Sequence, residues 1–237
     1  MLGGYAYITW SQAIGDDSEL VALAKQSADP NNAIDQRKLS YLTNQKFRKQ
    51  VPSLESFFSD GYSGAAPAPD STSSFYNDHL FTIFSVVMHP LSRGSVHINA
   101  SDPAGKPVID PNYVSNSYDL RAIVEAAKFN RKIAEAPSLR GSWTTEYDPG
   151  LDTTTDAQWE AWVRNNTLSI YHPLGSCSML PQAEGGVVDS NLKVYGVQNL
   201  RIVDASVIPI LPSGHLQTMV YGIAERAAEI MVAQYSQ

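Results

Sequence analysis

Two histidines in the last third of the chain have a residue type and a setting suited to proton chemistry. His172 lies in the run Tyr171-His172-Pro173-Leu174-Gly175-Ser176-Cys177, and His215 lies in Pro212-Ser213-Gly214-His215-Leu216. Each stands beside a glycine-containing turn, where backbone can approach a ligand closely. Imidazole titrates near neutral pH, so one ring of a pair can take a proton from an alcohol while the other donates a hydrogen bond. The spacing alone is also compatible with coincidence.

The residues after His215 predict a long helix over 216–234. Its apolar stripe consists of Met219, Val220, Ile223, Ala224, Ala227, Ile230 and Met231. The first N–H groups of a helix have no partner inside it and favour negative charge beyond its end, so a reduced flavin anion, a phosphate or an oxyanion would suit this position. An ordinary helix capped by Pro212-Ser213-Gly214 explains the same residues equally well.

Asp204-Ala205-Ser206 follows the short apolar run 200–203, which we expect to be a buried strand. A carboxylate at a strand end can accept hydrogen bonds from a ribose hydroxyl or from backbone amides. A simple turn aspartate is an equally good interpretation. His79, His89 and His97 stand in strand or turn contexts, and we interpret all three as structural.

Several familiar site motifs are missing from the sequence. It contains no GxGxxG run, Walker loop, HExxH pattern or GxSxG elbow, which argues against a complete dinucleotide site, a zinc protease and an α/β-hydrolase. The histidines lack close carboxylate or histidine neighbours at helical spacing, so we expect no metal site. Cys177 is the single cysteine, which excludes an intrachain disulfide, and a lone thiol is more often a small buried apolar side chain than a nucleophile.

Composition excludes further classes. The formal net charge of −7 argues against nucleic acid as a partner. No apolar run approaches the roughly 20 residues that span a bilayer, and the first residues do not resemble a signal peptide. We therefore expect a soluble protein, cytoplasmic or secreted, of unknown compartment. The sequons Asn99-Ala100-Ser101 and Asn165-Asn166-Thr167 arise often by chance and say little about secretion.

The pattern of apolar residues predicts strands and helices without βαβ regularity, which indicates the α+β class, an antiparallel sheet with flanking helices. We expect strands at residues 5–10, 80–88, 95–99, 107–111 and 200–203. We expect helices at 18–26, 31–49, 119–134 with Asp119 as the cap, 156–165 and 216–234. Residues 60–74, rich in glycine, proline and serine, predict a loop near a pocket mouth. Aromatic residues that could line a pocket or fill the core are Tyr62, Phe75, Tyr76 and Phe84.

Taken in order, these motifs resemble the carboxyl-terminal signature of the glucose–methanol–choline (GMC) flavoprotein oxidoreductases, especially fungal members similar to aryl-alcohol oxidases and glucose oxidases. The resemblance rests on the run from Tyr171 to Met231 and on the block from Pro90-Leu91-Ser92-Arg93-Gly94 through Asp110-Pro111-Asn112-Tyr113. It covers roughly residues 85–235, while the first 80 residues carry no distinctive motif.

The resemblance implies an FAD-dependent enzyme that oxidises a CH–OH group. His172 matches the family's active-site histidine, which would take the alcohol proton while hydride passes to the flavin. His215 matches the second active-site position and would orient the substrate and stabilise charge. Asp204 and Ala205 match cofactor-contacting positions, and Leu216, Gln217 and Thr218 match residues beside the flavin ring.

Family members begin with a βαβ unit that carries GxGxxG and holds the FAD diphosphate, and this sequence has no such run. The resemblance therefore implies a substrate-binding portion over 1–170 and, over 171–237, an active-site segment with a strand and helix that complete the FAD domain. Apolar faces that pack on that domain would be exposed unless covered. We expect the isolated chain to be colourless and without alcohol oxidase activity, needing the FAD-binding half or self-association.

Two other hypotheses remain open on the sequence alone. A flavin-independent acid–base catalyst of natural-product biosynthesis, such as a cyclase, dehydratase or isomerase, could keep the histidine pair. A truncated, non-catalytic interaction module is the third. The substrate, a small alcohol or natural product, and the choice between oxidase and dehydrogenase are not specified by any motif.

Overall fold

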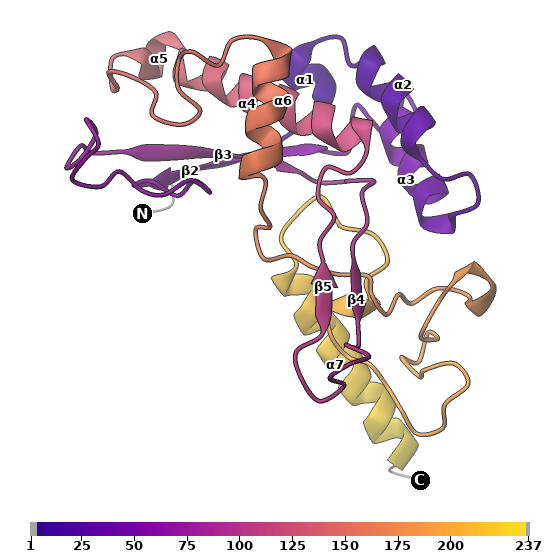
Figure 1. Ribbon diagram of the computed structural model, residues 1–237. Helices are drawn as coiled ribbons and strands as arrows, with labels where there is room; N and C mark the ends of the chain where they lie inside the picture. Colours follow the sequence, from indigo (N-terminus) through magenta and orange to yellow (C-terminus); the bar gives the residue numbers. More distant parts are fainter. Residues whose placement is uncertain (1–3, 236–237) are drawn as a thin grey trace. The chain divides into compact units, whose positions relative to one another are not determined.

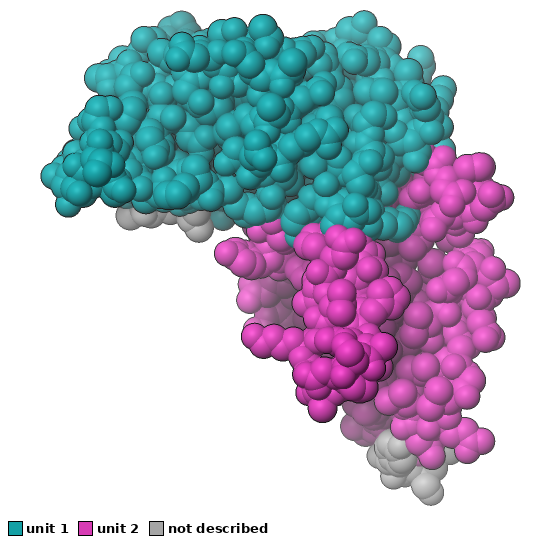
Figure 2. All heavy atoms as spheres, viewed as in Figure 1, with its two compact units in different colours: residues 1–27, 39–93, 112–168 teal, residues 28–38, 94–111, 169–237 magenta. Residues whose placement is uncertain are grey.

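The computed structural model describes residues 4–235, and the chain forms two compact units, which Figure 2 distinguishes by colour. The first unit contains the amino-terminal stretch to residue 27 together with residues 39–93 and 112–168. The second contains residues 28–38, 94–111 and the chain from 169 onward. Each unit is therefore assembled from segments that are distant in the sequence.

The first unit is built on a three-stranded antiparallel sheet in the order β1 (Tyr5–Ile8), β2 (Leu54–Asp60), β3 (Phe81–Val87) (Figure 1). Phe57 lies opposite both Tyr5 and Phe84 in the register. The three rings stack across the strands, with centroids 5.3 Å apart for Tyr5 and Phe57 and 4.5 Å apart for Phe57 and Phe84. Such cross-strand aromatic pairs stabilise a register that would otherwise slip.

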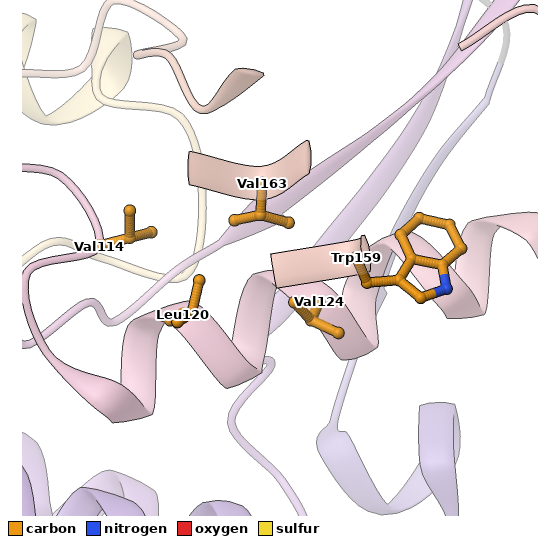
Figure 3. Packing of buried hydrophobic residues seen from close by; sticks show 5 residues of the cluster. All are labelled: Val114, Leu120, Val124, Trp159 and Val163. Carbon is orange, nitrogen blue, oxygen red and sulfur yellow. The ribbon is translucent and has the colours of Figure 1, made fainter. Parts of the chain in front are cut away.

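Helices accompany the sheet, and the longest of them is α4 (Ser117–Ala134). The other helices of the first unit are α1 (Trp10–Ile14), α2 (Ser18–Ser27), α5 (Pro137–Arg140) and α6 (Asp156–Asn166), while α3 (Ala33–Thr43) has its first residues in the second unit and its last in the first. α4 and α6 share a core of buried apolar side chains, shown in Figure 3, that comprises Val114, Leu120, Val124, Trp159 and Val163. α6 starts cleanly because Thr155 and Gln158 form a capping box.

Asn130 connects α4 to the sheet through buried hydrogen bonds. Its side-chain oxygen accepts from Ser56 Oγ at 2.7 Å, and its amide nitrogen donates to Ser85 Oγ at 2.6 Å and to the Ile83 carbonyl at 3.2 Å. Ser56 and Ser85 face each other on β2 and β3. A single amide thus fixes the position of the helix over both strands, because each buried polar group needs a partner.

Asp119 does not cap α4, contrary to the sequence-based expectation. Asn116 is the cap, and its side chain accepts from the Asp119 backbone N–H at 2.9 Å. The buried Asp119 carboxylate instead accepts from the N–H groups of Leu91 at 2.8 Å and Ser92 at 2.6 Å. Hydrogen bonds to a carboxylate are stronger than neutral ones, so Asp119 holds the turn after Pro90 against the first turn of the helix.

A charged network joins α4 to α6 on the surface of the first unit. Asp156 accepts from Arg121 at 2.7 Å and from Lys128 at 2.5 Å. Glu125 lies 3.2 Å from Arg121 and 3.1 Å from Lys128, and Glu19 lies 3.3 Å from Arg121. Networks of this kind contribute more than isolated surface pairs, which stabilise little.

The second unit has less regular structure. β4 (Ser95–His97) and β5 (Val108–Asp110) form an antiparallel hairpin, η1 (Gln182–Glu184) and η2 (Ala205–Val207) are short 3₁₀ turns, and α7 (Gln217–Tyr235) is the single long helix of this part. A small core gathers Val188, Leu192, Val207 and Ala227. Exposed large apolar side chains include Val96, Ile98, Val108 and Ile109 of the hairpin region and Met219, Tyr221, Met231 and Val232 of α7.

The antiparallel sheet with flanking helices confirms the α+β class, but several expected boundaries were wrong. β1 ends at Ile8, because Thr9 caps α1 and accepts from Gln12 N–H. α3 ends at Thr43 rather than at 49. Asn44 Oδ1 accepts from the N–H groups of Lys46 at 2.9 Å and Phe47 at 3.4 Å, which offers the backbone an alternative to the helix.

Strand expectations also needed correction. Residues 200–203 form no strand: only Arg201 makes an isolated bridge, to Lys193, and Leu200 and Val203 are exposed. β3 was expected to be buried, yet most of it is half-buried and Phe81 is exposed. β2 was not expected at all, because its sequence LESFFSD has no strict alternation of apolar and polar residues and mixes both kinds on each face.

Replacing Asn130 with alanine should lower the free energy of unfolding by about 1–3 kcal/mol, because the two serine hydroxyls and the Ile83 carbonyl lose a buried partner. Urea unfolding followed by circular dichroism measures the change. Asn165→Ala is the matched control, since Asn165 also lies on a helix but is exposed, and its effect should stay within about 0.5 kcal/mol. Equal losses in the two variants would contradict the role given to Asn130.

Asp156 should make stability depend on pH in acid. Hydrogen bonds from Lys128 and Arg121 lower the pKa of Asp156 from 3.8 to about 2. A lowered native pKa stabilises the fold above the unfolded value near 3.8, and this contribution disappears as the pH falls through about 2. The side chain is 56% exposed, so solvent screening keeps the contribution below about 1 kcal/mol.

Urea midpoints of the wild type and Asp156→Asn, measured between neutral pH and pH 2, test this expectation. The difference between the two proteins should shrink as the carboxylate is protonated, and 1 M salt should reduce it at every pH. Asp152→Asn, at an exposed carboxylate outside the network, is the control and should show no such convergence. A constant difference across the pH range would refute the assignment.

Candidate functional site

The second unit brings His172 and His215 together. Their ring centroids lie 4.9 Å apart and their planes are inclined at 84°, an edge-to-face arrangement. His172 is half-buried and His215 is exposed. A neutral imidazole has one N–H donor and one acceptor nitrogen, so two rings at this distance can accept and donate at a single small polar group.

An unusual backbone conformation precedes His172. Tyr171 has φ of 64°, which is uncommon for a residue with a side chain, and its ring is 91% exposed. Its N–H donates to Ser169 Oγ at 2.9 Å, which helps to hold this conformation. Left-handed conformations at residues other than glycine cost free energy and concentrate at functional positions. The conformation of Tyr171 therefore supports a functional role for the turn that carries His172.

Main-chain hydrogen bonds fix the segment after His172 to two other segments. Cys177 N–H donates to the Ser206 carbonyl at 3.0 Å, and Met179 N–H donates to the Val207 carbonyl at 2.8 Å. Val187 N–H donates to the Ser178 carbonyl at 2.9 Å. The buried Ser178 hydroxyl donates to the Gly175 carbonyl at 2.7 Å, which closes the turn behind His172.

His215 stands just before α7, which begins at Gln217. Leu216 is buried, and its carbonyl accepts from Val220 N–H at 3.0 Å, so this residue anchors the start of the helix. Gln217 and Thr218 are exposed. The first-turn N–H groups of a helix lack intrahelical partners, and this end of α7 is therefore suited to an acceptor or to negative charge.

Asp204 caps the short turn η2, since its side chain accepts from Ser206 N–H at 2.8 Å. The residue is exposed, and Ala205 is half-buried at the start of the turn. This hydrogen bond engages Oδ1 of the Asp204 carboxylate. It is compatible with both interpretations of Asp204, a turn residue and a contact for a ribose hydroxyl. Asp204 and Ala205 directly precede the Ser206 and Val207 carbonyls that hold the His172 segment.

The remaining histidines lie outside this pair. His89 is buried and stacks on Tyr41 with centroids 5.8 Å apart, as expected for a structural residue. His97 lies on the exposed strand β4, and His79 lines a shallow hollow of about 540 Å³ in the first unit together with Tyr62 and Phe75. Within the described residues 4–235 there is no cluster of three or more His, Cys, Asp or Glu side chains placed to hold a metal ion, and no helix long and apolar enough to cross a membrane.

Sequence reasoning missed two contributors to the site. The left-handed conformation of Tyr171 was not predicted. Aromatic residues rarely adopt it, so the residue type gives no indication of it. Ser178 was also missed, because its burial is visible only in the structure. A buried hydroxyl needs a hydrogen-bond partner, which here is the Gly175 carbonyl.

Gly185 and Gly186 turn out to need glycine for different reasons. Gly185 has φ of +83° with open space around it. A Cβ on Gly186 would lie 1.9 Å from the Leu180 carbonyl oxygen, where no real side chain fits. The close approach lets Gly186 N–H donate to the Pro181 carbonyl and returns the chain to Val187 beside Ser178.

Comparison with known proteins places these residues in a family context. The family model described as GMC oxidoreductase matches residues 90–224. A GMC oxidoreductase family protein of Malassezia sympodialis is 46% identical over 151 residues, which cover 64% of this chain and 24% of the relative. A glucose oxidase of Penicillium chrysogenum is 38% identical over 160 residues, covering 66% of this chain and 26% of the relative.

Solved structures of similar fold include oxidases. A fungal aryl-alcohol oxidase superposes with a TM-score of 0.76 at 29% identity, covering 98% of this chain and 39% of that one. The formate oxidase of Aspergillus oryzae gives a TM-score of 0.71 at 26% identity, over 98% of this chain and 38% of that one. In the curated relatives, the matched stretches span about a quarter of the relative's length.

Alanine at Gly186 should destabilise the protein far more than alanine at Gly185. The clash with the Leu180 carbonyl must move backbone, and we expect a loss of about 3 kcal/mol or more. Gly185→Ala meets only the strain of a left-handed conformation, about 1–2 kcal/mol. Urea unfolding of the two neighbouring variants measures both losses, and a smaller loss at Gly186 than at Gly185 would show that the turn is not built as described.

Proposed function

Because the chain belongs to the GMC oxidoreductase family, we propose that it supplies the substrate and active-site half of an FAD-dependent enzyme that oxidises a CH–OH group. The observation that carries the proposal is the edge-to-face pair of His172 and His215 at 4.9 Å. Both rings belong to the second unit, so their proximity does not depend on how the two units are placed.

His172 is the proposed base. An alcohol gives up its hydroxyl proton as its carbon is oxidised, and a neutral imidazole at hydrogen-bond distance can accept that proton. The turn that carries this ring is held by the Ser178 hydroxyl and by the main-chain bonds to Ser206 and Val207. Such support keeps a base oriented between turnovers, which general-base catalysis requires.

His215 is proposed to orient the alcohol oxygen. Its ring lies beside His172, and one of its nitrogens can donate a hydrogen bond to the oxygen as negative charge develops there. The position just before α7 adds the favourable field of the helix start. We assign His215 the stabilisation of charge rather than the removal of the proton.

The residues around the pair fit one edge of a flavin nucleotide. Asp204 offers an exposed carboxylate for hydroxyl donors, and the exposed Gln217 and Thr218 stand at a helix start suited to acceptor groups. With Ala205 and Leu216 they would hold the cofactor, which when bound supplies the acceptor for the two electrons that leave the alcohol carbon. The sequence has no GxGxxG run, so we propose that the diphosphate is held by residues outside this set, in the dinucleotide-binding half.

We propose the division of labour that the family resemblance implies: residues 1–170 contribute to substrate binding, and residues 171–237 carry the active-site segment and the helix that completes the FAD domain. The proposed substrate is a small alcohol or an alcohol-bearing natural product. The proposed partner is the dinucleotide-binding half of the family fold or a second copy.

The test is to mix the 237-residue chain with FAD and with the dinucleotide-binding part of a relative, and to follow alcohol-dependent reduction of a dye. His172→Ala should lower kcat roughly 10²–10⁴-fold, because the proton then leaves without a positioned base. His215→Asn should lose less, since an amide can still donate a hydrogen bond. His97→Ala, at an exposed histidine of the same unit, is the control and should leave kcat unchanged.

Flavin absorbance of each mixture separates loss of chemistry from loss of cofactor, and it should be equal in the wild type and His172→Ala. An unchanged kcat in His172→Ala would refute the role of the base. The chain on its own should be colourless. If the wild type shows neither flavin binding nor dye reduction in the mixture, the proposed oxidoreductase function is wrong, and acid–base turnover without flavin becomes the reading to test.

A further inference from the structure

The two sequons of the chain differ sharply in local structure. Asn99-Ala100-Ser101 lies in the connection between β4 and β5, whereas Asn165 and Asn166 belong to helix α6 and are followed by Thr167 (Figure 1). Solvent exposure does not separate them, since Asn99 is half-buried with exposed neighbours and Asn165 is exposed. The conformation of the backbone does.

In the first sequon the hydroxyl and the asparagine side chain meet. Ser101 Oγ donates to Asn99 Oδ1 at 2.7 Å, and Ser101 N–H donates to the same oxygen at 3.1 Å. The Asp102 N–H donates to the Asn99 carbonyl at 3.1 Å, which completes a tight turn. Among the described residues none accepts a hydrogen bond from Asn99 Nδ2, and every residue from 100 to 110 is exposed. The Asn99 amide nitrogen is therefore not engaged by another group of the described chain, and the residues that follow it are exposed.

The second sequon presents the opposite arrangement. Asn165 Nδ2 donates to the Ala161 carbonyl at 3.0 Å, and Thr167 Oγ1 donates back to the Val163 carbonyl at 2.7 Å. On a helix, side chains two positions apart point in different directions and do not face each other. The hydroxyl of Thr167 is consequently not available beside the amide of Asn165.

A sequon requires a hydroxyl two residues after the asparagine, so the enzyme that modifies it must read both side chains together. We propose that Asn99, and not Asn165, is the acceptor for an N-linked glycan in this chain. Asn99 Nδ2 would form a bond to the anomeric carbon of a lipid-pyrophosphate-linked oligosaccharide. The bond from that carbon to the pyrophosphate oxygen breaks, the lipid pyrophosphate leaves with the electron pair, and Nδ2 loses one proton. A bulky, polar glycan fits an exposed hairpin connection.

The proposal is tested by expressing the 237-residue chain behind a cleavable secretion leader in yeast. Peptide mass spectrometry after enzymatic deglycosylation in heavy-oxygen water marks each formerly modified asparagine. We expect one glycan, at Asn99. The gel mobility shift should disappear in Asn99→Gln and should remain unchanged in Asn165→Gln.

Ser101→Ala supplies a second variant, which should also lose the glycan while leaving the Asn99 side chain in place. Circular dichroism of the deglycosylated wild type and of both glutamine variants checks that the fold is retained. A glycan on Asn165, or a secreted wild-type chain without any glycan, would overturn the proposal. The test is independent of flavin binding and of the proposed enzymatic function.

Discussion

The second unit depends on the pairing of main-chain groups that belong to no regular sheet. Buried N–H and C=O groups need partners, and here turns and isolated bridges supply them. The Ser178 carbonyl accepts from the N–H groups of Leu180, Val187 and Val188, while the N–H groups of Cys177 and Met179 donate to the carbonyls of Ser206 and Val207. This arrangement leaves little freedom: glycine is required where the chain returns past Leu180, and His172 is carried on a turn whose far end is fixed.

The first unit satisfies the same requirement with side chains. Asn130 provides an amide that bonds two strands at once, and the Asp119 carboxylate accepts two N–H groups of the turn after Pro90. That turn lies at the start of the matched family region, and the buried Asp119 carboxylate fixes it against the first turn of α4. Regular elements can therefore be interrupted without leaving polar groups unpaired.

Elements with a clear apolar periodicity and residues within recognisable motifs could be predicted from the sequence. Helix α7, helix α6 and the β4–β5 hairpin follow from apolar spacing and turn residues, and the histidine pair followed from glycine-rich context and family resemblance. It failed where a side chain competes with the backbone, as Asn44 does at the end of α3. It also failed where an apolar run lacks a neighbouring strand, as at Leu200, and where a left-handed residue such as Tyr171 is set by its surroundings.

Helix α7 has a consequence for local unfolding. Of its side chains that the structure describes, only Ala227 is fully buried, whereas α4 buries seven residues. Helices draw most of their stability from packing, so the amides of α7 should exchange with solvent through small openings, while those of α4 exchange only when the unit unfolds. Gln217 and Thr218 begin that less protected helix. The edge of the site next to His215 therefore has the lowest free energy of local opening. A ligand that binds there must supply the free energy that orders the start of α7.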